Sequence, residues 1–177
     1  MLFAAAARPL AASIGRSAFV RSFATVGSQI PNVELHKNFP PEKIALGPYL
    51  QNKNVVIQIP DYVAKQDALR DKGVTEVIIL AVNDGAVMMN WAKSQKTALT
   101  MLTFLGDPNS ELTKALDLEL THPGPVSVLG PGRCKRFAMH VVNGEIKAVN
   151  VSEAPDDPAG DNDPSASLAD GILATMK

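Results

Sequence analysis

The spacing of hydrophobic residues changes repeatedly along the middle of the chain, between continuous runs and a helical period. The continuous runs are rich in β-branched and aliphatic residues, which is typical of buried strands. They occupy residues 55–59 (VVIQI), 74–82 (VTEVIILAV) and 99–105 (LTMLTFL). Helical spacing follows each run and predicts helices over 62–72, 84–96 and 111–120. Asp61 and Ser110 are placed as N-caps for the first and third of these helices.

The C-terminal third has the pattern of a β-hairpin followed by a helix. Residues 134–142 and 145–151 alternate as strands around Asn143-Gly144, a strong signal for a two-residue type I′ turn. A short strand is also expected before them, at 125–130 (PVSVLG). Residues 154–164 form an acidic loop rich in Pro and Gly, and the final helix begins after a cap at Ser165 or Ser167.

Before the first run, residues 26–50 are rich in turn-forming residues and carry a short apolar alternation at Val33 and Leu35. This segment is interpreted as extended, with one short hairpin. The order of elements is therefore β-α-β-α-β-α-β, a hairpin and a last helix. Such an order predicts an α/β protein whose mixed central sheet has a parallel core and is flanked by helices. The prediction is a single thioredoxin-like domain over residues 25–177.

The first 24 residues have a different composition from the rest of the chain. They contain Arg8, Arg16 and Arg21, are rich in Ala and Ser, and precede the first acidic residue, Glu34. Arginine-bearing segments without carboxylates are typical of mitochondrial presequences. Residues 1–24 are therefore interpreted as a presequence, disordered or cleaved, and a mitochondrial matrix location is expected.

The composition of the chain argues against several classes of function: nucleic-acid binding, membrane spanning, and sites built from several cysteines. The formal net charge is −1, which provides no basic field for nucleic acid, and no apolar run is long enough for a membrane helix. Cys134 is the only cysteine, so an internal disulfide and a multi-cysteine metal site are excluded. The three histidines are scattered without metal-ligand spacing, and no cofactor is expected. They are His36, His122 and His140.

Four stretches of the chain together resemble the peroxiredoxin type II family, whose members reduce hydrogen peroxide and alkyl hydroperoxides. The stretches are VGSQIPNVEL, LRDKGVTEVIILAVNDGAVMMNWAKSQ, FLGDPNSELTKALDLEL and GRCKRFAMHVVNGEIKAVNV. The resemblance runs from about Val26 to the C-terminus. It implies a hydroperoxide substrate, reduction by thioredoxin, glutaredoxin or glutathione, and a homodimer as one option.

The segment that carries the family's chemistry is missing from this sequence. In the family, a Pro-Gly-Ala-Phe-Thr-Pro-x-Cys segment lies between the strand similar to VVIQI and the next helix. Here Ile59-Pro60 is followed at once by Asp61-Tyr62, so the peroxidatic cysteine and its threonine are absent. Where some members carry a resolving cysteine, this chain has Ser165-Ala166-Ser167. We expect a strained or frayed junction between Gln58 and Tyr62.

Two residues remain as candidates for the site. The resemblance places the family's peroxide-contacting arginine at Arg136. Cys134, next to Arg133 and Lys135, is the only thiol. In a strand, alternate residues share a face, so its side chain is expected on the same face as Arg136. These positive neighbours predict a depressed pKa for the thiol. An inert or modifiable thiol is favoured over a catalytic one, because no helix N-terminus or threonine lies beside it in the sequence.

Three interpretations of the chain stay open. The first is a peroxiredoxin relative without peroxidase chemistry, acting if at all by association with an intact relative. The second is a thiol enzyme that uses Cys134. The third is a splice or gene-model variant of an active peroxidase, which the abrupt edges of the missing segment favour.

Overall fold

The strands predicted from buried aliphatic runs form the centre of a seven-stranded mixed sheet. The computed structural model describes residues 24–58 and 62–176. Strands β3 (Asn54–Gln58), β4 (Glu76–Ala81) and β5 (Leu102–Gly106) lie parallel to one another, with β4 in the middle. Most of their residues are β-branched or large and aliphatic, so they fit positions that are covered on both faces. The parallel core expected from the sequence is confirmed.

Antiparallel strands extend this core on both sides, in the order β2-β1-β5-β4-β3-β6-β7. The expected N-terminal hairpin is present as β1 (Glu34–Lys37) and β2 (Glu42–Ala45). On the other side, β6 (Arg136–Val142) and β7 (Glu145–Ser152) pair around Asn143-Gly144. Both turn residues have positive φ, 51° and 79°, which is the conformation of the predicted type I′ turn.

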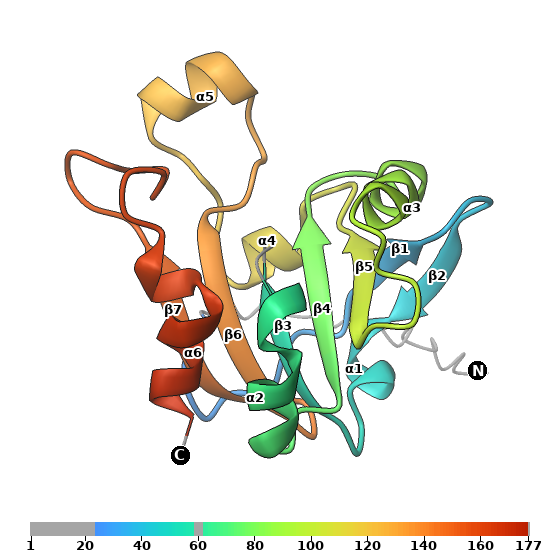
Figure 1. Cartoon of the computed structure of the whole chain (residues 1–177). Coiled ribbons are helices and arrows are strands. Elements are labelled where there is room, and N and C mark those ends of the chain that lie inside the picture. Colours follow the sequence, from blue (N-terminus) through green and yellow to red (C-terminus); the bar gives the residue numbers. More distant parts are fainter. Residues whose placement is uncertain (1–23, 59–61, 177) are drawn as a thin grey trace, which may run out of the picture.

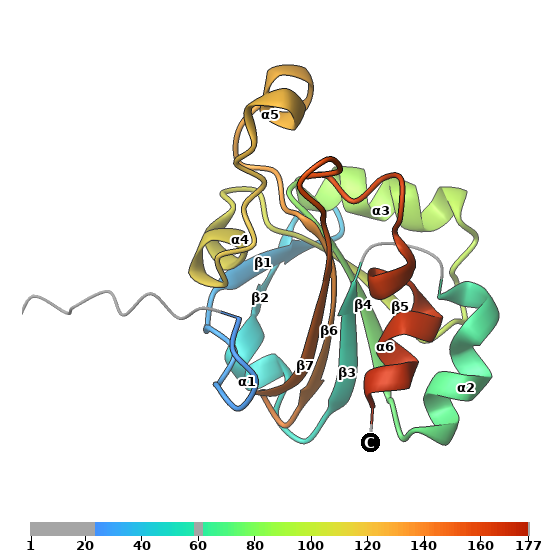
Figure 2. The same ribbon diagram turned by 90° about the vertical axis from the view of Figure 1, so that its left-hand side faces the viewer.

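Helices cover both faces of the sheet and enclose two hydrophobic cores (Figures 1 and 2). One core lies under α1 (Leu46–Tyr49) and α4 (Glu111–Ala115). The other lies under three helices on the opposite face. These are α2 (Gln66–Asp71), α3 (Gly85–Ser94) and α6 (Ala169–Thr175). Because β3 sends Val55 and Ile57 into the first core and Val56 into the second, it joins the two layers.

The strand expected at 125–130 is wrong, because residues Pro123–Leu129 form helix α5. Pro123 occupies the first turn, where proline fits a helix, and the His122 side chain accepts a hydrogen bond from the Gly124 backbone N–H at 3.2 Å. Helix α5 projects away from the sheet (Figure 2), and its Val128 and Leu129 are exposed. The apolar residues at 125–130 therefore lie away from the sheet and have no neighbouring strand in the described structure with which to pair.

Ser110 occupies the N-cap position of α4, as expected, but its side chain does not cap the helix. Ser110 has φ 56° and donates its hydroxyl to the Gly132 carbonyl at 2.6 Å instead. Asp107 caps α4: its carboxylate accepts hydrogen bonds from the backbone N–H groups of Glu111 and Thr113, at 2.8 and 2.9 Å. Asp107 is 1% exposed, so it satisfies these donors inside the protein.

Several element boundaries differ from the prediction. The helix after β3 begins as a single 3₁₀ turn, η1 (Val63–Lys65), and becomes α-helical only at Gln66. Strand β5 starts at Leu102, three residues later than expected, because Leu99 has φ 68° and cannot continue a strand. The last helix follows a 3₁₀ turn, η2 (Ser165–Ser167), and neither serine caps it. The acidic loop at 154–164 is confirmed as irregular structure.

None of the helices in the described part of the chain is long and apolar enough to cross a membrane. The segment predicted to be a presequence, residues 1–24, lies outside the described residues except for Ala24.

Replacing Asp107 tests its role as the cap of α4. We expect Asp107→Ala to lower the free energy of unfolding by about 2 kcal/mol, since it leaves buried backbone N–H groups without an acceptor. The measurement is urea denaturation followed by circular dichroism. Asp71→Ala, at an exposed position at the end of α2, is the control and should change stability little. Equal losses in the two variants would contradict the assignment.

His140 on β6 predicts a pH dependence of stability. Its side chain is 8% exposed, its Nε2 lies 2.7 Å from Asn54 Oδ1, and burial together with the nearby Lys147 lowers its pKa below the ordinary 6.5. Below pH 6.5 the unfolded chain takes up the proton more readily than the folded chain, so acidification should reduce stability. Unfolding free energies at pH 7.5 and 5.5 should differ less in His140→Gln than in wild type. An equal difference in His140→Gln and in wild type would contradict this role of His140.

Candidate functional site at the carboxyl end of β3

Polar side chains gather where β3 ends, at the centre of the sheet. Gln58 is the last residue of β3 and pairs with Ile79 of β4 on one side and Ala138 of β6 on the other. In α/β sheets, the carboxyl ends of parallel strands are the usual place for ligands and catalytic groups. Gln58 is 1% exposed and is the only buried polar residue of β3, whose other buried residues are aliphatic.

Arg136 lies at the same end of the sheet, because β6 runs antiparallel to β3 and begins with this residue. Its Nη2 donates to Asp161 Oδ1 at 2.7 Å, so the acidic loop supplies a carboxylate partner. The side chain is 30% exposed, yet its Nε is buried and has no hydrogen-bond partner in the described structure. The Nη2 end of the guanidinium is therefore paired with a carboxylate, while its Nε–H group has no acceptor among the described residues.

The C-terminal segment closes over this region through Ser167. The Ser167 carbonyl accepts a hydrogen bond from Gln58 Nε2 at 2.8 Å and from the Tyr62 hydroxyl at 3.4 Å. The Ser167 hydroxyl lies 2.8 Å from that of Ser152, at the end of β7, and donates to the Pro164 carbonyl at 3.1 Å. Gln58, Tyr62 and Ser167 are all at most 1% exposed. These contacts tie η2 to the strand ends of β3 and β7.

Among the described residues, this arrangement lacks the groups needed for nucleophilic chemistry. Neither Ser152 nor Ser167 has a histidine or carboxylate partner among the described residues, so neither hydroxyl is activated. Gln58 Oε1 is buried without a donor in the same part of the chain, which adds an unsatisfied acceptor to the unsatisfied Arg136 Nε. No cluster of metal ligands is present in residues 24–58 and 62–176. The region is polar and closed, and the described residues provide it with no nucleophile.

Comparison with known proteins identifies the scaffold. Residues 25–166 match the family model described as Redoxin. Peroxisomal membrane associated protein 20 of Schizosaccharomyces pombe is 30% identical over 164 residues, which cover 85% of this chain and 98% of that protein. The chain belongs to the peroxiredoxin family.

Two further relatives agree with this assignment. The mitochondrial peroxiredoxin-2F of Arabidopsis thaliana is 35% identical over 99 residues, 56% of this chain and 47% of that protein. Reduced Prx3 of Vibrio vulnificus, solved in complex with hydrogen peroxide, matches with a TM-score of 0.71 at 28% identity, covering 86% of this chain and 95% of that one. The predicted thioredoxin-like fold of this redoxin is confirmed.

The only thiol of this redoxin is placed away from the polar site. Cys134 precedes β6, in an isolated bridge with Glu119, and packs against the core under α1 and α4. Arg136 shares a strand face with Ala138, which belongs to the other core. The expectation that Cys134 and Arg136 lie on one strand face is therefore wrong.

The depressed pKa expected for Cys134 is also wrong. Burial raises the pKa of this thiol above its ordinary 9.0 and outweighs hydrogen bonds with the Val82 and Cys134 backbone, which lower it. The charge of Asp107 also raises the pKa, and that of Arg133 lowers it. Sequence neighbours suggested a cationic environment, but the folded chain surrounds the sulfur with the apolar core and a carboxylate. The thiol is protonated at neutral pH, and a protonated thiol is a poor nucleophile.

The expected junction between Gln58 and Tyr62 is outside the described residues, because these exclude 59–61. On either side of it, the sequence interpretation missed Gln58, Tyr62 and Ser167 as members of the site. A polar residue at the end of an aliphatic strand was the available signal for Gln58. Nothing in the sequence pattern pointed to Asp161 as the partner of Arg136.

The reactivity of Cys134 provides a direct test of its environment. We expect iodoacetamide to alkylate the folded chain at pH 7.5 at least about tenfold more slowly than the chain unfolded in guanidinium, because partial burial restricts access to the thiol and its raised pKa keeps it protonated. The rate in the folded chain should rise steeply only above pH 9. Mass spectrometry measures the alkylated fraction, and Cys134→Ser confirms the labelled position. Equal rates for the folded and unfolded chain at pH 7.5 would show a reactive thiolate instead.

Proposed function

We propose that this chain is a peroxiredoxin-family scaffold that does not reduce hydroperoxides as it stands. Reduction of a peroxide by this family requires a thiolate that attacks one peroxide oxygen. The observation that supports the proposal is the environment of Cys134, the only thiol in the sequence. It is partly buried, its pKa is raised, and it packs against the core under α1 and α4, whereas Arg136 lies on the strand face of the other core. No other side chain can act as the family's nucleophile.

The retained arginine fits a site that has lost its thiolate. In the family resemblance, Arg136 contacts the peroxidatic sulfur and the peroxide. In this chain its guanidinium binds Asp161 at 2.7 Å. The Asp161 carboxylate thus supplies the negative charge that the peroxidatic thiolate supplies in the family. On this proposal, Arg136 is inherited but no longer has its catalytic role.

The product that carries the family's activity is proposed to be a longer form of the same chain. An intact form with the Pro-Gly-Ala-Phe-Thr-Pro-x-Cys segment would reduce hydroperoxides and accept electrons from thioredoxin, glutaredoxin or glutathione. The 177-residue chain would then be a splice or gene-model variant. The continuous Redoxin match over residues 25–166 supports this, since the scaffold on both sides of the junction is preserved.

Association with an intact relative, or with a second copy, is the alternative function. Val128 and Leu129 of the projecting helix α5 are 82% and 50% exposed, and exposed apolar residues on a projecting element favour a protein contact. Such a chain would act as a non-catalytic subunit.

We also propose a mitochondrial location, with residues 1–24 as the presequence and 25–177 as the mature domain. The arginines at 8, 16 and 21 and the absence of acidic residues before Glu34 support it. Similarity to the mitochondrial peroxiredoxin-2F is consistent with this location.

A peroxide-consumption assay tests the proposed loss of activity. The 177-residue chain and its Cys134→Ser variant are each incubated with hydrogen peroxide or cumene hydroperoxide and with thioredoxin, glutaredoxin or glutathione systems. We expect both chains to remain at the rate of the reductant alone. Turnover by the wild type that disappears in Cys134→Ser would show that Cys134 is a working nucleophile. In parallel, sequencing the transcript between the codons for Ile59 and Asp61 shows whether a longer form exists.

A further inference from the structure

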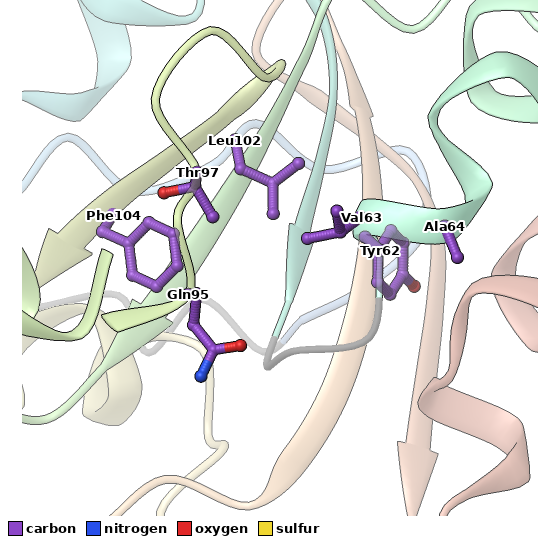
Figure 3. A pocket seen from close by; sticks show the side chains of 7 residues that line it. All are labelled: Tyr62, Val63, Ala64, Gln95, Thr97, Leu102 and Phe104. Carbon is purple, nitrogen blue, oxygen red and sulfur yellow. The ribbon is translucent and has the colours of Figure 1, made fainter. Parts of the chain in front are cut away.

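Two adjoining hollows lie beside α3, on the face of the sheet that α2, α3 and α6 cover. The first has a volume of about 270 Å³ and lies between η1 and β5. Figure 3 shows Val63 and Leu102 pointing into it, with Phe104 and Gln95 across from η1. The second has about 440 Å³ and extends past α3 to the end of β1. Thr97, Leu102 and Phe104 line both hollows, so together they form one groove, here called the α3 groove.

The floor of the α3 groove is apolar. Leu102 and Phe104 of β5 form its centre, and Met89 and Ala92 of α3 form one wall. Phe104 also packs edge-on against Trp91, with ring centroids 5.3 Å apart. A concave apolar floor of this size is typical of small-molecule sites rather than of flat protein or membrane contacts.

One end of the α3 groove is positively charged. Lys37, Lys93 and Lys96 line it, and no acidic residue does. None of these lysines forms an ion pair within residues 24–58 and 62–176. By contrast, Lys43 pairs with Glu34 and Lys147 with Glu145, each at 2.8 Å. In a chain whose net charge is −1, three unpaired lysines around one hollow form a local site for an anion.

The loop along the α3 groove holds a leucine in an unfavourable environment. Leu99 is fully exposed and has φ 68°, and Lys96 in the same loop has φ 53°. Left-handed backbone at non-glycine residues costs free energy and is often found at binding sites. Thr97 and Ala98 of the same loop line the groove, and Leu99 lies just outside it.

We propose that the α3 groove binds a long-chain carboxylate, a fatty acid in its monomeric form. The carboxylate interacts with Lys37, Lys93 and Lys96, and the alkyl chain runs over Leu102 and Phe104 towards Val63. Charge complementarity selects an anion, and the apolar floor selects a molecule with a hydrocarbon tail. The concave shape favours one small amphiphile over a membrane surface or an acidic peptide. This binding does not depend on peroxidase chemistry.

Trp91 provides the signal for the test, because it is the only tryptophan and contacts Phe104 on the groove floor. The full chain is titrated with dodecanoate below its micelle concentration while the fluorescence of Trp91 is recorded. We expect saturable binding that weakens as salt is added. Dodecanol, which has the tail without the charge, and acetate, which has the charge without the tail, should each bind at least about tenfold more weakly, since each lacks one of the two contacts.

Charge reversal at the groove separates specific from general binding. The double variant Lys93→Glu and Lys96→Glu changes exposed positions only, so the fold should be retained, and circular dichroism checks this. Its affinity for dodecanoate should fall at least about tenfold, because repulsion replaces attraction at the head-group end. Lys114→Glu, at an exposed position on α4 over the other core, is the matched control and should bind as wild type.

Three results would overturn the proposal. They are equal affinity for dodecanoate and dodecanol, unchanged affinity in the double variant, and no saturable response of Trp91. The proposal would also be overturned if the chain co-sedimented with phosphatidylglycerol vesicles but did not bind dodecanoate. That result would identify a membrane surface as the occupant.

Discussion

Burial of β3 on both faces is the constraint on which the rest of the structure depends. Alternate residues of this one short strand enter the two cores, and its backbone pairs with β4 and β6 at the centre of the sheet. The neighbouring strands and both helical layers pack against it. Because the strand is held from both sides and on both faces, its sheet pairing and packing fix where its carboxyl end lies, and with it the position of Gln58.

The second consequence concerns how the C-terminal segment is held. Gln58 at the end of β3 donates to the Ser167 carbonyl, and Ser152 at the end of β7 contacts the Ser167 hydroxyl. A single buried residue thus receives contacts from strand ends that lie far apart in the sequence. The polar groups that remain at this end of the sheet act as structural contacts between strands and helix. Only Gln58 Oε1 and Arg136 Nε are left unsatisfied among the described buried side chains, and both lie at this end.

The sequence predicts the sheet well and the site poorly, for different physical reasons. β3, β4 and the hairpin around Asn143-Gly144 follow from local patterns that the environment reinforces: dense β-branched residues, and a turn that demands positive φ. The run PVSVLG shows the limit of such patterns, because its apolar alternation fits a strand while Pro123 and the absence of a neighbouring edge produce a helix. Cys134 shows the same limit for electrostatics. Its sequence neighbours are cations, but burial is the largest influence on the pKa of its thiol, and the charge of Asp107, 27 positions away along the chain, also raises that pKa. Likewise, Asp161 is close to Arg136 only after the acidic loop has folded back.

On the proposed function, the pairing of Arg136 with Asp161 has a consequence for any attempt to give this chain peroxidase activity. Asp161 is tethered to the same domain, so it competes for the guanidinium as an internal ligand, at an effective concentration of millimolar order or above. A cysteine reintroduced after β3 would meet an arginine that is already occupied, and its thiolate would gain less from that positive charge. Restoring the missing segment would therefore be one half of the repair. The other half would be to release the arginine from the acidic loop.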